Sequence, residues 1–121
     1  MGVVLIVEDD EQVRVFVESA IQEISHSTLT ASNVEEALAL LRDEQQQIDL
    51  LFTDIRLWDE AQGGITLAQE ARGLRPGIRV LYTTGEGVTD GMRALFVDGF
   101  LFLAKPYNLD ALRALIREQL G

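Results

Sequence analysis

Short apolar runs alternate with longer amphipathic stretches along the chain, and this alternation predicts strands and helices in turn. Apolar runs of roughly 4–8 residues bounded by polar residues are typical of buried strands, whereas apolar residues spaced three and four apart are typical of helices. The pattern predicts five strands, at residues 3–7, 27–31, 50–53, 80–83 and 100–104. It also predicts five helices, at residues 10–23, 32–42, 65–74, 90–98 and 108–120.

Polar residues at the helix ends support these boundaries. Ser32, with a glutamate three residues later, has the form of a capping box, so we expect Ser32 to cap the second helix. We expect Thr89 or Asp90 to cap the fourth helix, which should continue until Gly99 ends it. Asn108 is expected to cap the fifth helix.

Five successive strand–helix units predict an α/β protein with a single, doubly wound, five-stranded parallel sheet. Right-handed crossovers would place helices on both faces of that sheet. In the strand order 2-1-3-4-5, ligands bind beyond the carboxyl ends of the strands, in the crevice between strands 1 and 3 where the order reverses. The chain shows no linker and no internal repeat, so we expect residues 1–121 to form one domain.

The amino-acid composition excludes several classes of function. The chain has 20 acidic and 10 basic residues and a formal net charge of −10. Nucleic-acid binding and attachment to anionic membranes need a basic surface, so both are disfavoured. The absence of cysteine excludes disulfides and cysteine-based zinc sites. The sequence contains neither a secretion signal nor an apolar stretch of about 18 residues, and we expect a cytoplasmic protein.

Reactive polar residues follow four of the predicted strands. Glu8 and Asp9 follow the first strand, Asp54 the third, Thr84 the fourth and Lys105 the fifth. Because parallel strands end at the same edge of a sheet, we expect these five side chains to converge.

The convergent residues suggest a metal and a phosphate. Neighbouring carboxylates raise one another's pKa unless a cation neutralises them, and a few carboxylates suit Mg²⁺. We predict one divalent ion held by Asp9, Asp54 and a nearby backbone carbonyl, with Glu8 acting through water. A carboxylate such as Asp54 can also attack phosphorus and form an aspartyl phosphate. Lys105 and Thr84 would then contact the phosphate oxygens.

With these residues in place, the whole chain resembles the receiver domains of two-component response regulators, the chemotaxis-regulator-like family. The resemblance is carried by Glu8-Asp9, by Asp54 within Phe-Thr-Asp-Ile-Arg-Leu, by Thr84-Gly85 and by Lys105-Pro106, in the family's order and spacing. It implies a flavodoxin-like (βα)5 fold and a phosphorylation-dependent switch. It also implies that Asp54 receives its phosphoryl group from a histidine kinase or a histidine phosphotransfer protein.

The resemblance assigns further roles. Glu8 and Asp9 would bind Mg²⁺ together with Asp54 and the backbone carbonyl of Arg56. Phe102 stands at the position of the family's switch aromatic, which moves inward with the threonine on phosphorylation and remodels the surface of helix 4, strand 5 and helix 5. The peptide bond between the family's lysine and proline, here residues 105 and 106, is often cis.

Several positions depart from the family pattern. Trp58 stands where receiver domains usually carry proline, and about two extra residues, within 59–62, lengthen an acidic loop beside the site. Arg56 and Glu86 occupy the positions that tune the lifetime of the phosphate in the family. We hypothesise that they pair across the mouth of the site and limit access of water. An unchanged autodephosphorylation rate after alanine substitution at both positions would refute this. His26, the single histidine, is interpreted as a loop residue.

Three other functions fit part of this pattern. A Mg²⁺-dependent phosphohydrolase of the haloacid-dehalogenase type would carry a second aspartate two residues after the nucleophile, where this chain has Arg56. A flavodoxin-like electron carrier needs a phosphate loop rich in Gly, Ser and Thr, whereas Glu8-Asp9-Asp10 would repel FMN phosphate. A pseudo-receiver that only makes protein contacts would not need a complete acidic site. We expect no enzyme activity beyond self-phosphorylation and autodephosphorylation.

Because the chain ends with the helix at residues 108–120, we expect either a single-domain regulator or a receiver excised from a longer protein. Without an effector domain, the expected output is protein–protein contact. Its candidate surface lies on helix 4, strand 5 and helix 5, with a weak homodimer as one use. The residues expected on that surface are Met92, Arg93, Phe96 and Arg113.

Overall fold

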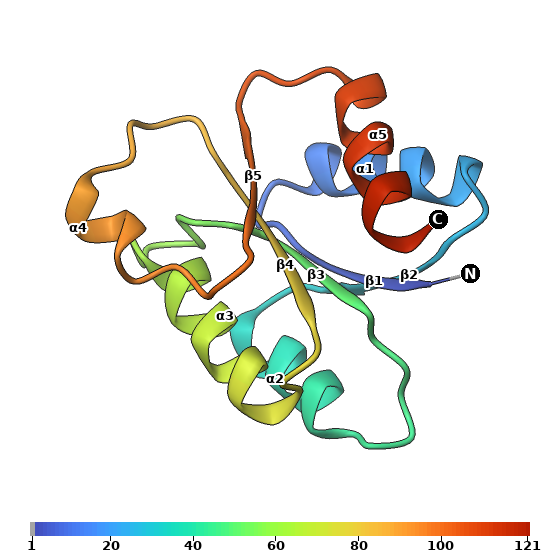
Figure 1. Cartoon of the computed structure of the whole chain (residues 1–121), viewed down its shortest axis with the longest axis horizontal. Coiled ribbons are helices and arrows are strands. Elements are labelled where there is room, and N and C mark those ends of the chain that lie inside the picture. The colour runs from blue at the N-terminus through green and yellow to red at the C-terminus, as the bar shows by residue number, and fades with distance from the viewer. Residues whose placement is uncertain (1) are drawn as a thin grey trace.

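The computed structural model describes residues 2–121 and shows a parallel sheet with helices on both faces (Figure 1). Met1, the first residue of the expected domain, lies outside the described residues. The strands are β1 (Val3–Val7), β2 (Ser27–Ala31), β3 (Leu50–Asp54), β4 (Arg79–Thr84) and β5 (Leu101–Ala104). The helices are α1 (Glu11–Glu23), α2 (Val34–Arg42), α3 (Gly63–Leu74), α4 (Asp90–Arg93) and α5 (Leu109–Leu120).

The strand order is β2-β1-β3-β4-β5, and every pair of neighbours is parallel. This confirms the predicted fold class and order. The register pairs Val7 with Thr53 and Asp54 with Thr83, so β1, β3 and β4 end at the same level. The segments that leave these strands therefore emerge side by side at one edge.

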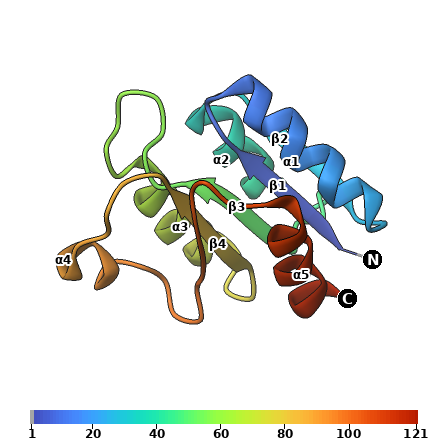
Figure 2. The ribbon, with the colours of Figure 1, turned by 90° about the horizontal axis from the view of Figure 1, so that it is seen from above.

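Alternate strand residues build two apolar layers, because successive side chains of a strand point to opposite faces. Leu5 and Val7 pack in the layer under α2 and α3, whereas Val4 and Ile6 pack in the layer under α1 and α5. Figure 1 shows α1 and α5 on one side of the sheet and α2 and α3 on the other, and Figure 2 shows the same elements from above. All four of these side chains have no exposed surface. Apolar packing on both faces thus holds β1 in the centre of the sheet. This packing fixes the position of Glu8 and Asp9, which directly follow the strand.

Side-chain caps begin most helices, and one prediction was wrong by a residue. Asn33, not Ser32, caps α2, and its Oδ1 accepts a hydrogen bond from Glu36 N at 2.8 Å. The Ser32 hydroxyl instead donates to the Glu36 carboxylate at 2.6 Å. Serine and asparagine cap about equally well, so the sequence could not rank two adjacent candidates. The predicted caps Thr89 and Asn108 are confirmed.

Helix α4 is shorter than predicted, ending at Arg93 rather than just before Gly99. The reason is tertiary: the hydroxyl of Tyr82, on β4, accepts the Val97 N–H at 3.1 Å. The ring of Tyr82 also stacks on Phe96, with ring centroids 4.2 Å apart. Phe96 is consequently buried, which corrects its expected place on an exposed output surface.

Two side chains of α3 bind the same segment. Gln69 Nε2 donates to the Leu95 carbonyl at 3.0 Å, and Arg72 Nη1 donates to the Asp98 carbonyl at 3.0 Å. These donors satisfy two backbone carbonyls of the segment that follows α4. Smaller differences are that α3 begins at Gly63 rather than residue 65 and β5 at Leu101 rather than residue 100.

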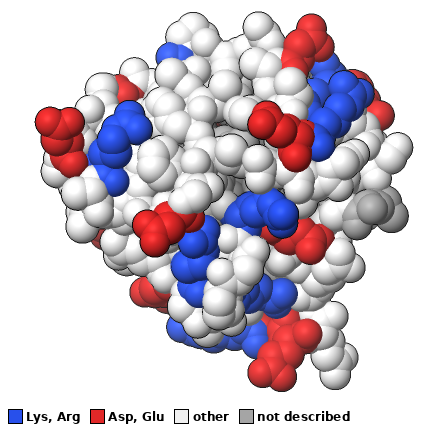
Figure 3. Space-filling model, in the orientation of Figure 1, with Lys and Arg blue, Asp and Glu red and all other residues white. Residues whose placement is uncertain are grey.

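Charged side chains of both signs are interspersed on the face shown in Figure 3, where arginines and lysines lie beside aspartates and glutamates. Ion pairs hold some of them in place. Arg113, for example, binds Glu23 of α1 and Asp110 of its own helix, so it ties α5 to α1, and its place on the output surface stays a prediction. Within residues 2–121, no helix has the length and apolar character needed to cross a lipid bilayer.

Candidate functional site

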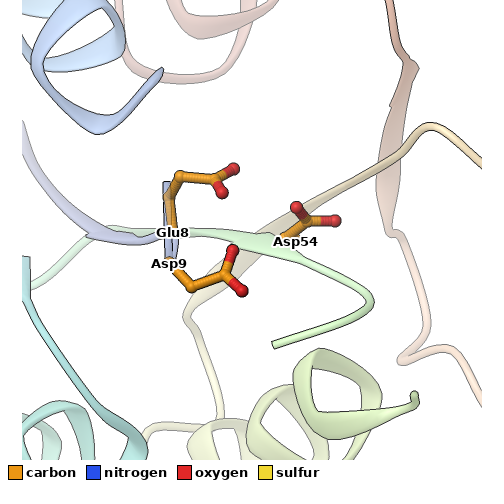
Figure 4. A group of neighbouring side chains, drawn as sticks. All are labelled: Glu8, Asp9 and Asp54. Atoms are coloured by element: carbon orange, nitrogen blue, oxygen red, sulfur yellow. The ribbon is translucent and has the colours of Figure 1, made fainter. Parts of the chain in front are cut away.

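Three carboxylates gather where β1 and β3 end. Glu8 and Asp9 follow β1 directly, and Asp54 is the last residue of β3. One carboxylate oxygen of each lies within 4.8 Å of the others. Figure 4 shows the three side chains grouped around the same space. Glu8 is fully buried and Asp54 is 7% exposed, whereas Asp9 faces solvent. The structure therefore brings the predicted carboxylates together.

Lys105 completes the charge arrangement from the end of β5. Its Nζ lies 2.7 Å from Asp54 Oδ2 and 3.3 Å from Glu8 Oε2. Burial opposes the charged form of Lys105, but the hydrogen bond to Asp54 and the charges of Glu8 and Asp54 outweigh it and raise its pKa. Lys105 is therefore a protonated ammonium held against the carboxylates. The Lys105–Pro106 peptide bond is cis, as the resemblance implied.

The ionised form of Glu8 is unfavourable in this site. Burial raises the pKa of Glu8 to about 7, although the Asp10 N–H at 3.0 Å and the Lys105 ammonium lower it and the Asp54 charge raises it. The single ammonium of Lys105 therefore does not fully neutralise the charge of the three carboxylates in this site. An added cation would favour the ionised form of Glu8.

The donor set fits a hard divalent cation. Mg²⁺ prefers oxygen ligands, takes one or two carboxylates and keeps several waters. Here buried carboxylates at Glu8 and Asp54 form one wall, and the solvent-facing Asp9 leaves an open side for water. The Arg56 carbonyl belongs to the segment that leaves β3 beside Asp54, and its role as a ligand stays a prediction.

Thr84 lies at the same edge, as the last residue of β4, and is 5% exposed. Its hydroxyl accepts the Glu86 N–H at 3.1 Å, and its carbonyl accepts the Lys105 N–H at 2.9 Å. The hydrogen bonds among residues 2–121 do not join the Thr84 hydroxyl to Asp54. The threonine is therefore near the acceptor but engaged with its own loop.

Phe102 lies on β5, paired in register with Tyr82. Its side chain is half-buried and packs against the apolar layer under α2 and α3. This is a position from which an aromatic ring can turn further in or out. The predicted switching movement itself stays a prediction.

Arg56 and Glu86 are both exposed, and the ion pairs among residues 2–121 do not include one between them. The predicted pairing across the mouth of the site is thus not formed in this structure. Their influence on the lifetime of a phosphate stays a prediction, because exposed side chains can act without binding each other.

Asp9 makes one contact that its sequence pattern did not indicate. The Trp58 backbone N–H donates to Asp9 Oδ2 at 2.9 Å. Trp58 has φ of 53°, a left-handed conformation that is uncommon for residues other than glycine. Only the departure from proline at this position, together with the lengthened loop, signalled that the segment is unusual.

Two more groups near the site were missed. The Tyr107 hydroxyl is buried without a hydrogen-bond partner among residues 2–121, and burial raises the pKa of Tyr107 to about 12. Arg14 Nη1 donates to the Glu8 carbonyl at 2.9 Å and anchors the end of β1 to α1. Far from the site, His26 lies in a loop as predicted, but it is buried and its Nδ1 accepts the Gly2 N–H.

An apolar groove lies beside Lys105. It has a volume of about 530 Å³ and runs between α1 and the segment from residue 105 to residue 109. Phe16 of α1 lines it and is 63% exposed, which is unusual for a large apolar side chain.

Comparison with known proteins decides the family. Residues 4–117 match the family model of the response regulator receiver domain. The chain belongs to this family. Receiver domains are signalling domains rather than classical enzymes, and they bind Mg²⁺ at an acidic pocket and interact with histidine kinases and effector domains. This outcome favours the expected switch over the phosphohydrolase and electron-carrier alternatives.

Similar proteins cover the receiver domain from end to end. It is 36% identical over 113 residues to the response regulator protein PilR of Pseudomonas aeruginosa, an alignment that covers 93% of the chain and 24% of PilR. The chain thus spans about a quarter of that relative. A CheY-like receiver domain protein from Methanospirillum hungatei superimposes with a TM-score of 0.86 at 25% identity, covering 99% and 94% of the two chains.

A third comparison concerns the fold alone. The response regulator protein TrrA from Thermotoga maritima, whose crystal structure is a complex with Mg²⁺-BeF, has a TM-score of 0.80 at 24% identity. The comparison covers 99% of this chain and 100% of that one.

Proposed function

We propose that this receiver domain works by accepting a phosphoryl group on Asp54, with Mg²⁺ held by Glu8, Asp9, Asp54 and the Arg56 carbonyl. The donor would be a histidine kinase or a histidine phosphotransfer protein. The observation that carries the proposal is the joint geometry of three carboxylates within 4.8 Å and an ammonium 2.7 Å from Asp54. The complex of TrrA, a protein of the same fold, with Mg²⁺-BeF supports the choice of ion and of phosphoryl chemistry.

Asp54 and Lys105 have different roles in the proposed phosphoryl transfer. A carboxylate oxygen of Asp54 attacks the phosphorus of a phosphohistidine, the P–N bond breaks, and its electron pair leaves with the imidazole nitrogen. Lys105 binds Asp54 Oδ2, which leaves the other oxygen free to attack. The ammonium then neutralises charge on the transferred group, as phosphoryl transfer requires. When bound, Mg²⁺ supplies the remaining positive charge.

The donor needs a surface to contact, and the groove beside Lys105 offers one. Its apolar lining and the exposed Phe16 provide an interface next to the acceptor. A histidine kinase or phosphotransfer partner of this kind would place the domain in the cytoplasm.

The switch would operate through Thr84 and Phe102. A phosphate on Asp54 adds negative charge and strong acceptor oxygens, which attract the Thr84 hydroxyl away from Glu86 N. The space that Thr84 vacates would admit Phe102 and alter the surface of α4, β5 and α5. Met92 and Arg93 of that surface remain candidate contacts for a downstream protein or for a weak homodimer.

The proposal is tested by incubating the protein with acetyl phosphate and Mg²⁺ and measuring its intact mass. We expect a gain of one phosphoryl group, lost when EDTA replaces Mg²⁺ and absent in Asp54→Asn. An adduct that forms equally in Asp54→Asn would reject Asp54 as the acceptor. The decay of the adduct after gel filtration then separates a switch, whose adduct persists long enough to signal, from a fast phosphohydrolase.

A further inference from the structure

The Asp9 carboxylate is held from a distant part of the chain. The Trp58 N–H that reaches it belongs to the segment between β3 and α3, 49 residues away in sequence. Asp9 is otherwise exposed, and an exposed carboxylate on a short side chain rotates freely in water unless something binds it. The hydrogen bond is charge-assisted, which makes it stronger than a bond between neutral groups.

The turn around Trp58 points this N–H at the Asp9 carboxylate. Leu57 and Glu60 exchange two backbone hydrogen bonds, of 3.0 Å and 2.8 Å, and so close a tight turn with Trp58 inside it. Trp58 takes the left-handed conformation that this turn requires. Its half-buried indole packs against the apolar layer under α2 and α3, which holds the unfavourable backbone in place.

Proline could not serve in this role. It has no backbone N–H, and its ring fixes φ near about −65°, far from the observed 53°. The contact with Asp9 therefore depends on the residue by which this chain departs from the usual receiver pattern.

We propose that Trp58 is a positioning residue for the metal site, whose N–H orients the Asp9 carboxylate toward Glu8 and Asp54 before the cation binds. This inference rests on the proposed function, because it takes Asp9 to be a metal ligand. Each carboxylate oxygen can accept more than one partner, so Oδ2 keeps the hydrogen bond while the carboxylate ligates. Groups that orient a ligand in this way typically contribute about 10–100-fold to metal affinity.

Two substitutions separate the N–H from the indole. Trp58→Pro and Trp58→Gly both remove the ring, but only glycine keeps the N–H and tolerates a positive φ. Titration calorimetry with Mg²⁺ on the unphosphorylated protein should give a Kd at least about 10-fold higher for Trp58→Pro than for Trp58→Gly. Equal Kd values for the two variants would overturn the inference.

A second measurement does not depend on the proline variant folding. In the metal-free protein, the Trp58 amide proton should exchange with solvent at least about 10-fold more slowly in the wild type than in Asp9→Ala, which lacks the acceptor. Equal exchange rates would also overturn the inference.

The proposed function and the positioning role of Trp58 are contradicted by different results. If the wild type binds Mg²⁺ but the Trp58 variants bind it equally, only the positioning role is wrong. If the wild type itself shows no Mg²⁺ binding, both the proposed function and the positioning role are wrong.

Discussion

At the residue scale, the unfavourable electrostatic energy of the site lies in the ionised carboxylate of Glu8. This carboxyl is fully buried, and a single ammonium at 3.3 Å does not compensate for lost hydration and for the charge of Asp54. Metal-binding pockets of this kind trade stability in the empty state for affinity, because the cation relieves the repulsion when it binds. The cost should be visible as a dependence of stability on pH.

We expect Glu8→Gln to stabilise the metal-free protein at pH 8 but not at pH 4. The pKa of Glu8 is about 7 in the folded protein, above its ordinary value of 4.5, so folding favours its protonated form. Stability linked to that proton is complete below pH 4.5 and is lost as the pH rises to about 7. The neutral glutamine avoids this loss, which amounts to about 3 kcal/mol at about 1.4 kcal/mol per pKa unit, with the effect of Lys105 already included in the shift.

Urea unfolding in EDTA at the two pH values measures this effect. Glu118→Gln, at an exposed position of α5, is the matched control for the loss of one charge. An equal difference between wild type and Glu8→Gln at both pH values would contradict the assignment of the unfavourable charge to Glu8.

At the element scale, the close approach of α3 to β3 positions the acceptor. Gly64, in the first turn of α3, packs directly against the backbone of Asp54 and donates its N–H to the Ile55 carbonyl at 2.8 Å. A Cβ on Gly64 would overlap the Asp54 carbonyl oxygen and lie 2.8 Å from its carbon. The backbone cannot yield without moving Asp54, so this contact requires glycine.

Gly64→Ala should therefore destabilise the protein by more than about 2 kcal/mol, because overpacking against backbone strains the fold. Gly73→Ala is the matched control in the same helix, where a Cβ would meet nothing within 4 Å. It should stabilise the protein by roughly 0.5–1 kcal/mol through helix propensity. The free energies of unfolding in urea measure both effects, and two changes of the same sign would contradict the packing argument.

At the scale of the whole molecule, the site joins segments that are distant in sequence, and the net charge of −10 adds repulsion that a bound cation reduces. Mg²⁺ should consequently stabilise the entire fold rather than only one loop. The tryptophan beside Asp9 provides a reporter of binding, because its backbone contacts a proposed ligand.

We expect saturating Mg²⁺, at about 100 times its Kd, to add about 2.7 kcal/mol of stability and to raise Tm by about 10 °C. Trp58 fluorescence should change on adding Mg²⁺ and again on adding beryllofluoride. NaCl at matched ionic strength controls for general screening of the negative charge, and Asp9→Asn should reduce the Mg²⁺ effect. A shift in Tm that NaCl reproduces, with flat fluorescence in both titrations, would count against the site.

Much of the fold could be predicted from the sequence, because patterns of consecutive residues mark its strands. Apolar runs such as Val3–Val7 have the length and the β-branched residues of a buried strand, and a parallel sheet brings all strand ends to one edge. Glu8, Asp9, Asp54 and Lys105 follow from that edge alone. Adjacent caps such as Ser32 and Asn33 could not be ranked, because both residue types cap helices well.

By itself, then, the sequence determined the alternation of strands and helices, the family's acidic cluster and the lysine opposite it, since periodicity and strand endings are properties of consecutive residues. Only the tertiary structure decided where α4 ends and what orients Asp9. The Tyr82 hydroxyl that binds Val97 and the Trp58 N–H that binds Asp9 act across 15 and 49 residues. Such contacts exist only after the sheet has assembled, because no local pattern records which distant donor a side chain will meet.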